Sequence, residues 1–199
     1  MVSLIPGSGP IGGAPIPGIM SGAGIRSPYF VNEAGTNITT TSTRLYYIPI
    51  YLDRIFTFAG IKTRNGGTGD NGDTYRVGLY AEATAGGPGA LVNDCGEITL
   101  DASASIVRTA SSSFSTTTIG WHYLAFHSNQ AVSMNQCTTS PGGNLVPTSA
   151  DGLPTLAFNS STDGNFAIPY VDTTYGALAS TAVAPTASTN AAPVTFLFV

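Results

Sequence analysis

The chain has 199 residues, of which 42% are hydrophobic and only 9% are charged, and its formal net charge is −4. This length can fill the core of one domain, but the surface has to be built from Ser, Thr, Asn, Gly and Ala, which indicates that partners cover much of it. No basic cluster is present, which excludes nucleic acid as an expected ligand. No apolar run reaches the roughly 18 residues of a membrane span, and the N-terminus lacks the pattern of a signal peptide.

Residues 1–28 are rich in Gly and Pro, and Ile5-Pro-Gly7 recurs as Ile16-Pro-Gly18. Pro removes backbone donors and Gly raises the entropic cost of ordering, so this segment is not expected to form a helix or sheet of its own. A disordered tail is one interpretation, but such tails are usually polar and charged, whereas this one is apolar. We therefore predict an extended arm that anchors the protein on a neighbouring subunit through spaced apolar side chains: Leu4, Ile5, Ile11, Ile16, Ile19 and Met20.

A connector rich in Ser, Thr and Asn follows at residues 29–43 and predicts one edge strand. From residue 44 to residue 199 the chain reads as a β-sandwich with a C-terminal extension. Short runs of β-branched and aromatic residues bounded by Gly, Asn, Asp or Pro predict strands at residues 44–52, 53–62, 74–81 and 120–127. The first run is apolar on both faces, as in a strand buried between two layers, and Pro49 places it at an edge or at a bulge.

The remaining segments predict shorter elements. Residues 64–73 form a glycine-rich hairpin loop in which Asp70, Asn71 and Asp73 offer oxygen ligands, but their spacing does not match a calcium loop, so we expect a solvated turn. Short strands are expected at residues 91–92, 97–100, 105–109 and 114–118, and an Ala/Thr/Pro linker at residues 177–193. The terminal run 194–199 is a strand that must pair in the core sheet or with another subunit. No segment has helical periodicity.

The titratable residues do not form a catalytic or metal motif. His122 and His127 are five residues apart on one predicted strand, so they face opposite sides and do not share a metal ion. No Ser or Cys lies in a nucleophile elbow, and no pair of carboxylates stands out for glycoside hydrolysis. Cys95 and Cys137 can form one disulfide, although two free thiols are favoured. The sequence thus predicts no enzyme, no metal and no cofactor.

The order of several motifs resembles a jelly-roll module of tailed-bacteriophage structural proteins. The resemblance covers about residues 44–135 and rests on these segments: Arg44-Leu-Tyr-Tyr-Ile-Pro49, Ile61, Tyr75-Arg-Val-Gly-Leu-Tyr80, Gly86-Gly-Pro-Gly-Ala-Leu91 and Gly120-Trp-His-Tyr-Leu-Ala125. It implies an all-β, antiparallel jelly-roll β-sandwich, here with an extended N-terminal arm. Such modules occur in head decoration or fibre proteins, collar proteins and tail fibres.

The resemblance therefore implies a noncatalytic virion protein, assembled in the host cytoplasm, whose partners are the major capsid or tail proteins. We also expect a homo-oligomer, with a trimer as the working hypothesis. An alternative is a receptor-binding module for a cell-surface glycan, with exposed rings stacking on sugars. The candidate rings for this alternative are Tyr46, Tyr80, Trp121 and Tyr123, for which packing in the core is the competing interpretation.

Overall fold

The computed structural model describes residues 25–26, 37–52, 54–67, 70–101, 107–138, 168–189, 191–193 and 195–198. Within them the protein is all-β, and none of these residues lies in a helix long and apolar enough to cross a membrane. The described residues form these strands: β1 (Ile25–Arg26), β2 (Asn37–Thr39), β3 (Arg44–Leu52), β4 (Thr57–Arg64), β5 (Thr74–Glu82), β6 (Pro88–Thr99), β7 (Val107–Ser115), β8 (Gly120–Ser128), β9 (Ser133–Thr138), β10 (Ile168–Asp172), β11 (Ala187–Thr189), β12 (Ala191–Pro193) and β13 (Thr195–Phe198).

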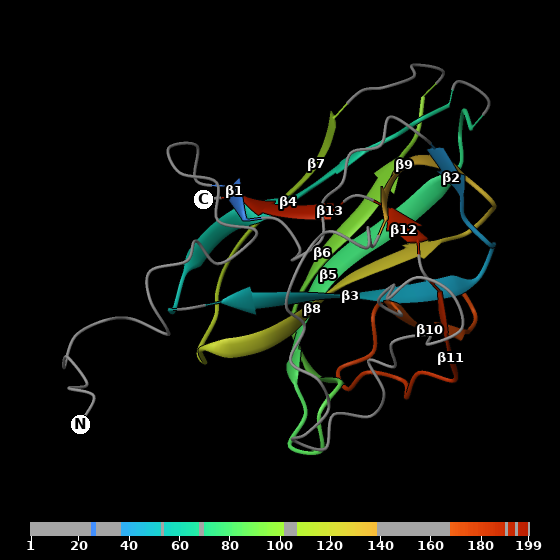
Figure 1. The fold of residues 1–199 in the computed structure, drawn as a ribbon. Coiled ribbons are helices and arrows are strands. Elements are labelled where there is room, and N and C mark those ends of the chain that lie inside the picture. The colour runs from blue at the N-terminus through green and yellow to red at the C-terminus, as the bar shows by residue number, and fades with distance from the viewer. Residues whose placement is uncertain are drawn as a thin grey trace, which may run out of the picture.

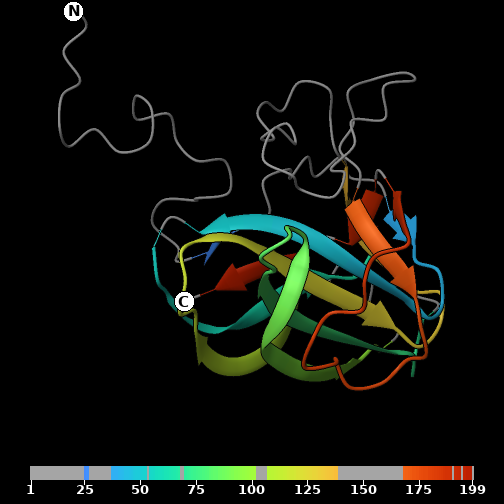
Figure 2. The same cartoon turned by 90° about the horizontal axis from the view of Figure 1, so that it is seen from below.

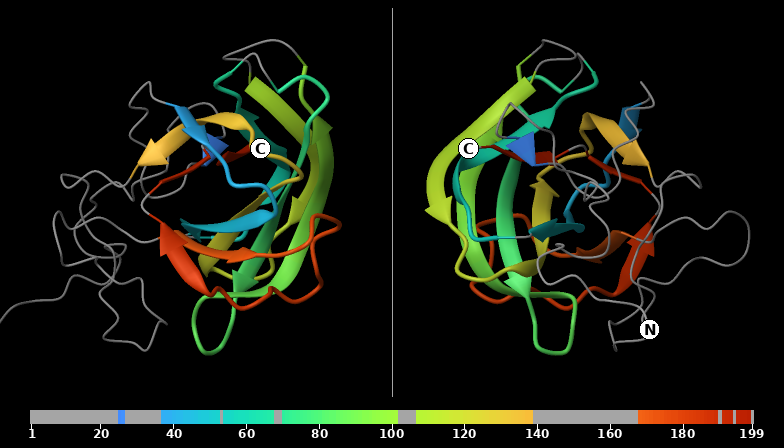
Figure 3. Two further views of the ribbon diagram at one scale, coloured as in Figure 1. Left: turned by 90° about the vertical axis from the view of Figure 1, so that its right-hand side faces the viewer. Right: turned by 60° about the vertical axis from the view of Figure 1, so that its left-hand side comes forward.

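The strands form three antiparallel sheets that are consistent with a β-sandwich. A six-stranded sheet has the order β11-β10-β3-β8-β5-β6, a four-stranded sheet the order β1-β13-β4-β7, and a three-stranded sheet the order β12-β9-β2. Figure 1 shows β1 and β13 at one end of the molecule and β10 and β11 at the other. Viewed from the side of β10 and β11, the sheets wrap around a common interior (Figure 3). These findings confirm the all-β class and the antiparallel pairing, whereas the jelly-roll connection stays a prediction.

The main core lies between the layers and takes one face of each strand. Along β3 the even-numbered side chains from Tyr46 to Leu52 point into it, and β5 adds Tyr75, Val77 and Leu79. Strand β4 adds Phe58 and Ile61, and β13 adds Leu197, whose side chain is fully buried. The alternation follows from the two-residue period of a strand. On β5, Tyr80 points to the opposite face of the sheet and is buried there as well.

A second apolar cluster lies on the opposite face of the six-stranded sheet. Its buried members are Leu45, Tyr47, Tyr80, Tyr123, Ala125, Val171 and Leu178. Residues 173–186, which we call the strap, cross this face between β10 and β11; in Figure 2 the strap is the orange-red segment beside the green strands. Strand β3 is therefore buried on both faces, as its two-sided apolar sequence predicted.

The strap overturns the predicted linker at residues 177–193. Leu178 is buried, Thr181 bridges to Ala90 of β6, and β11 and β12 add strands to β10 and β9. A linker would leave its backbone groups in water, but these residues exchange hydrogen bonds with two sheets. The segment is therefore part of the sandwich.

Other predictions are refined by the pairing. Pro49 causes no bulge, since β3 and β8 pair in one continuous register; the described pairs of β10 with β3 end at Tyr46, so Pro49 lies where β3 has edge character. The two short strands predicted at residues 91–92 and 97–100 are one strand, β6, with irregular register against β5. Those at 105–109 and 114–118 likewise merge into the single strand β7.

The connector and the terminal run behave as predicted where they are described, whereas the end of the arm pairs within the same chain instead of on a neighbouring subunit. The connector supplies β2 at the edge of the three-stranded sheet, and β13 pairs with β4 in the core of the four-stranded sheet. Of the arm at residues 1–28, only β1 is described, and it pairs antiparallel with β13 through Ile25 with Phe198 and Arg26 with Leu197. The six apolar anchoring residues from Leu4 to Met20 lie outside the described residues.

Candidate functional site

The two histidines point to opposite faces of β8, which confirms the prediction from their spacing. His122 is buried on the inner face, where its Nδ1 lies 3.1 Å from the Gly120 carbonyl oxygen. His127 is buried on the outer face, where its Nε2 lies 3.3 Å from the Thr43 carbonyl oxygen. Burial lowers the pKa of both imidazoles. The described residues contain no group of three or more His, Cys, Asp or Glu side chains that could hold a metal ion.

The acidic residues of the described loops and strands serve packing and pairing. Asp94 accepts hydrogen bonds from Arg76 at 2.9 Å and from the backbone N–H of Leu178 at 3.1 Å. Asp172 pairs with Arg44 at the end of β10, at 2.9 Å. Asp70, a candidate in the calcium interpretation, accepts the backbone N–H of Ser133 at 2.8 Å and thus holds the β4–β5 loop against β9.

Cys95 is a free thiol in β6 and packs against the main core. Burial raises its pKa to about 11, so the thiol is protonated and unreactive at neutral pH. Its partner in the disulfide alternative, Cys137, lies in β9, and its side chain is outside the described residues. The finding for Cys95 agrees with the favoured interpretation of free thiols.

The four candidate rings for glycan stacking divide between the two faces of the six-stranded sheet. Tyr46 points into the main core. Tyr80, Trp121 and Tyr123 are on the opposite face of the six-stranded sheet, the face that carries the second apolar cluster. Tyr46, Tyr80 and Tyr123 are at most 2% exposed, so they present no surface for a sugar ring. Their positions fit the competing interpretation, core packing. Trp121 is only partly buried.

The strap provides hydrogen-bond partners for the hydroxyls of two of the covered tyrosines, whereas the third, Tyr123, bonds to the Gly87 backbone. The Tyr47 hydroxyl donates to the Val183 carbonyl at 3.0 Å, and the Tyr80 hydroxyl donates to the Ala179 carbonyl at 2.9 Å. Burial, followed by the charge of Asp94, raises the pKa of Tyr80 to about 12. These rings therefore anchor the strap rather than a ligand, because a buried hydroxyl needs a hydrogen-bond partner.

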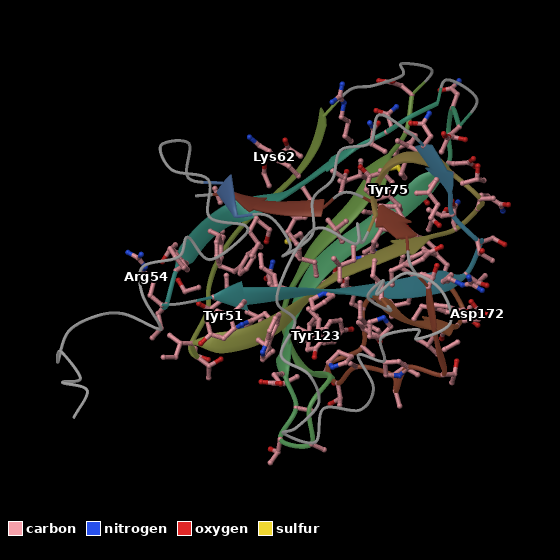
Figure 4. All side chains as sticks on the ribbon, viewed as in Figure 1. Tyr51, Arg54, Lys62, Tyr75, Tyr123 and Asp172 are labelled. Carbon is pink, nitrogen blue, oxygen red and sulfur yellow. The ribbon has the colours of Figure 1, made fainter. Side chains whose placement is uncertain are left out.

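Trp121 lies at the end of the sandwich where β3 finishes and β8 begins. Its ring packs edge-on against Tyr51, its cross-strand neighbour, with 5.4 Å between the ring centroids. Two loops meet here, since Phe56 and Thr116 exchange two hydrogen bonds: the Phe56 N–H donates to Thr116 Oγ1 at 3.1 Å, and the Thr116 N–H donates to the Phe56 carbonyl at 3.0 Å. Figure 4 places Tyr51 and Arg54 at this end and Asp172 at the opposite end.

The same loops carry the two most exposed large apolar side chains of the described residues. Ile55 is 60% exposed and Ile119 is 64% exposed. We call Tyr51, Ile55, Phe56, Ile119 and Trp121 the tip. The two isoleucines are exposed and the three rings are half-buried. Exposed apolar side chains that gather at one end of a domain are typical of a contact surface. The sequence analysis found Trp121 but missed its neighbours, because the β3–β8 register and the joining of the two loops were not available from the sequence.

No protein-family model matches the chain, and no curated protein matches it. The class of protein is therefore defined by the fold and the site alone. The described part consists of antiparallel sheets consistent with a β-sandwich, and it contains two buried histidines and a partly exposed apolar tip. The strap covers the face formed by Tyr47, Tyr80 and Tyr123, which we call the tyrosine face. The tip can bind by hydrophobic contact and ring stacking.

Proposed function

We propose that the protein is a noncatalytic structural protein of a bacteriophage virion, of the capsid-decoration or fibre type. In this proposal the arm at residues 1–28 anchors the protein to major capsid or tail proteins, and a jelly-roll sandwich is displayed outward. A homo-oligomer, with three-fold symmetry as the working hypothesis, would cover part of the sparsely charged surface.

The observation that carries the proposal is the pairing of β1 with β13. The arm's last described residues, Ile25 and Arg26, form a strand on the C-terminal strand of the four-stranded sheet. Main-chain hydrogen bonds hold a strand that is added to a sheet, so this pairing would fix the end of the arm to the sandwich. The resemblance of residues 44–135 to phage jelly-roll modules and the 9% charged residues support the same function.

The proposal is tested on purified particles from the virus that encodes the chain. Quantitative mass spectrometry should find the chain at a fixed copy number per particle, and particles from a gene deletion should lack a defined density in cryo-electron microscopy. The position of that density distinguishes head from tail. Absence of the chain from purified particles would contradict the proposal.

A second function, glycan recognition, is favoured by one observation only, the Tyr51–Trp121 ring pair at the tip. In this alternative the tip of a tail fibre or receptor-binding protein stacks on a cell-surface sugar. Glycan-array binding that is lost in Trp121→Ala but retained in Tyr80→Phe, whose hydroxyl anchors the strap, would favour this function. No binding to any glycan would remove it.

A further inference from the structure

His127 lies at the junction between the six-stranded sheet and the strap. Its imidazole packs against the ring of Tyr175 in the strap, with 5.2 Å between centroids, and is 2% exposed. The Tyr175 hydroxyl donates to Glu97 Oε2 on β6 at 2.7 Å, which places the Tyr175 ring across the sheet. The histidine is therefore closed off from water by the first residues of the strap.

A positive charge faces the same imidazole from the neighbouring strand. Arg76 of β5 is the direct cross-strand neighbour of His127. Its guanidinium donates one hydrogen bond to Asp94, while its Nε is buried without a hydrogen-bond partner. Although Asp94 pairs with Arg76, the positive charge of Arg76 still lowers the pKa of His127, because it repels a second cation beside it.

Asp94 links this charge to the strap. The carboxylate oxygen that binds Arg76 also accepts the backbone N–H of Leu178 in the strap, at 3.1 Å. The strap root, residues 173–178, is held further by the Thr173 N–H, which donates to the Thr43 carbonyl at 2.9 Å; the same carbonyl faces His127. Protonation of His127 would disturb all of these contacts at once.

We propose that the strap root is a pH-sensitive closure, which stays shut over neutral His127 and opens when His127 is protonated. Opening lets water reach the imidazolium and Arg76, which are cross-strand neighbours in the sheet, and water weakens the repulsion between their charges. Opening also withdraws Leu178 from the tyrosine face, so apolar surface around Tyr80 becomes accessible in acid. The far part of the strap, residues 179–186, is bonded separately to β6 and stays in place, since Ala182 donates to Gly89 at 2.8 Å.

The charged and titratable groups around His127 favour this sense of the switch. Burial is the largest influence and lowers its pKa; the Thr173 and Thr43 carbonyls act in the opposite direction, and the charge of Arg76 lowers it further. From β6, Asp94 is paired with Arg76, whereas Glu97 accepts only the neutral Tyr175 hydroxyl, so its carboxylate acts in the opposite direction and favours a cation nearby. At the β3 and β10 side, Arg44 and Asp172 neutralise each other.

The experiment uses the full chain, in which His122 and His127 are the only histidines. Nuclear magnetic resonance would follow both imidazoles between about pH 7.5 and about pH 4.5. In parallel, amide hydrogen exchange, corrected for its intrinsic pH dependence, would report opening at Thr173 and Leu178 in the root and at Ala182 in the far part. We expect the root to open severalfold more often in acid, and the pH midpoint of this increase should equal that of the His127 titration. Exchange at Ala182 should not change.

Two variants separate the proposal from general acid destabilisation. His127→Gln should make root opening independent of pH, whereas His122→Gln, which changes the buried histidine of the other face, should leave it intact. If His127→Gln does not fold, the unmodified chain still gives the test, because the pH midpoint of root opening can be compared with the titration midpoints of His127 and His122. Root exchange that is flat with pH, or that follows His122, would overturn the proposal, as would an imidazolium that stays buried between the Thr43 and Thr173 carbonyls.

Discussion

Alanine at Gly78 is predicted to break the contact between the sheet and the strap. A Cβ atom at this position would lie 2.3 Å from Leu178 Cδ1 and 2.6 Å from the Asn93 carbonyl oxygen. Leu178 can rotate away, but Asn93 is main chain in β6, and reaching an ordinary contact of 3.4 Å requires a shift of 0.8 Å (3.4 − 2.6). Gly78 is therefore required by the close approach of two backbones.

The magnitude follows from two contributions. Overpacking of this kind costs roughly 1–3 kcal/mol, and exposing a buried Leu side chain costs roughly 1.5–3 kcal/mol. We expect Gly78→Ala to lower the free energy of unfolding by about 3 kcal/mol, because Leu178 is displaced only in part. Leu178→Ala alone should cost about 2–3 kcal/mol, towards the lower end for large-to-small changes, since the site lies beneath a single covering segment.

A double-mutant cycle isolates the contact. Guanidinium unfolding can be followed by the fluorescence of Trp121, the single tryptophan of the chain. In the Leu178→Ala background, Gly78→Ala should cost at least about 1 kcal/mol less than in the unmodified protein. Gly176→Ala is the matched control in the strap: no atom lies within 4 Å of its added Cβ, so the change should stay within about 0.5 kcal/mol. Equal costs of Gly78→Ala in both backgrounds would refute the reasoning.

Further predictions concern pH and the two ends of the sandwich. The lowered pKa of His122 means that its contribution to stability is present above about pH 6.5 and is lost as pH falls. His122→Gln should therefore reduce the fall of the denaturant midpoint between about pH 7.5 and about pH 4.5, and the part that remains includes the contribution of His127. The raised pKa of Tyr80 means the opposite: its contribution is present below about pH 10 and is lost towards about pH 12, and Tyr80→Phe should weaken this alkaline loss in the same assay. Leu197→Ala in β13 should cost about 2–5 kcal/mol in chemical denaturation, since the side chain is fully buried. Ile119→Ser should change that free energy by no more than about 0.5 kcal/mol, because the side chain is exposed; a large loss would show that the tip is a packed element.

The sequence predicted elements whose side chains carry a strong local pattern. Residues 44–52 are apolar on both faces, and the strand is indeed buried on both. The terminal strand was predicted to pair because an exposed apolar strand would invite aggregation, and it does pair with β4. The opposite faces of His122 and His127 followed from strand parity alone.

The strap could not be predicted, because its signal is distributed over distant residues. Its Ala, Thr and Pro composition reads as a linker, and the partners that fix it, such as Tyr80 and Asp94, lie far away in the sequence. For the same reason the sequence could not show which of the four candidate rings are buried and which one reaches the surface. Alternation places Tyr80 and Tyr123 on one face, but the cover over them is a tertiary feature.

The most direct test of the proposed function compares the full chain with a chain that begins at Gly24, which loses most of the arm but keeps the Ile25 and Arg26 pairs with β13. Both proteins would be added to virus particles lacking this protein and sedimented. We predict that only the full chain sediments with the particles, while both chains unfold at the same denaturant midpoint. Equal binding of the two chains would contradict anchoring by the arm and place the contact on the sandwich itself.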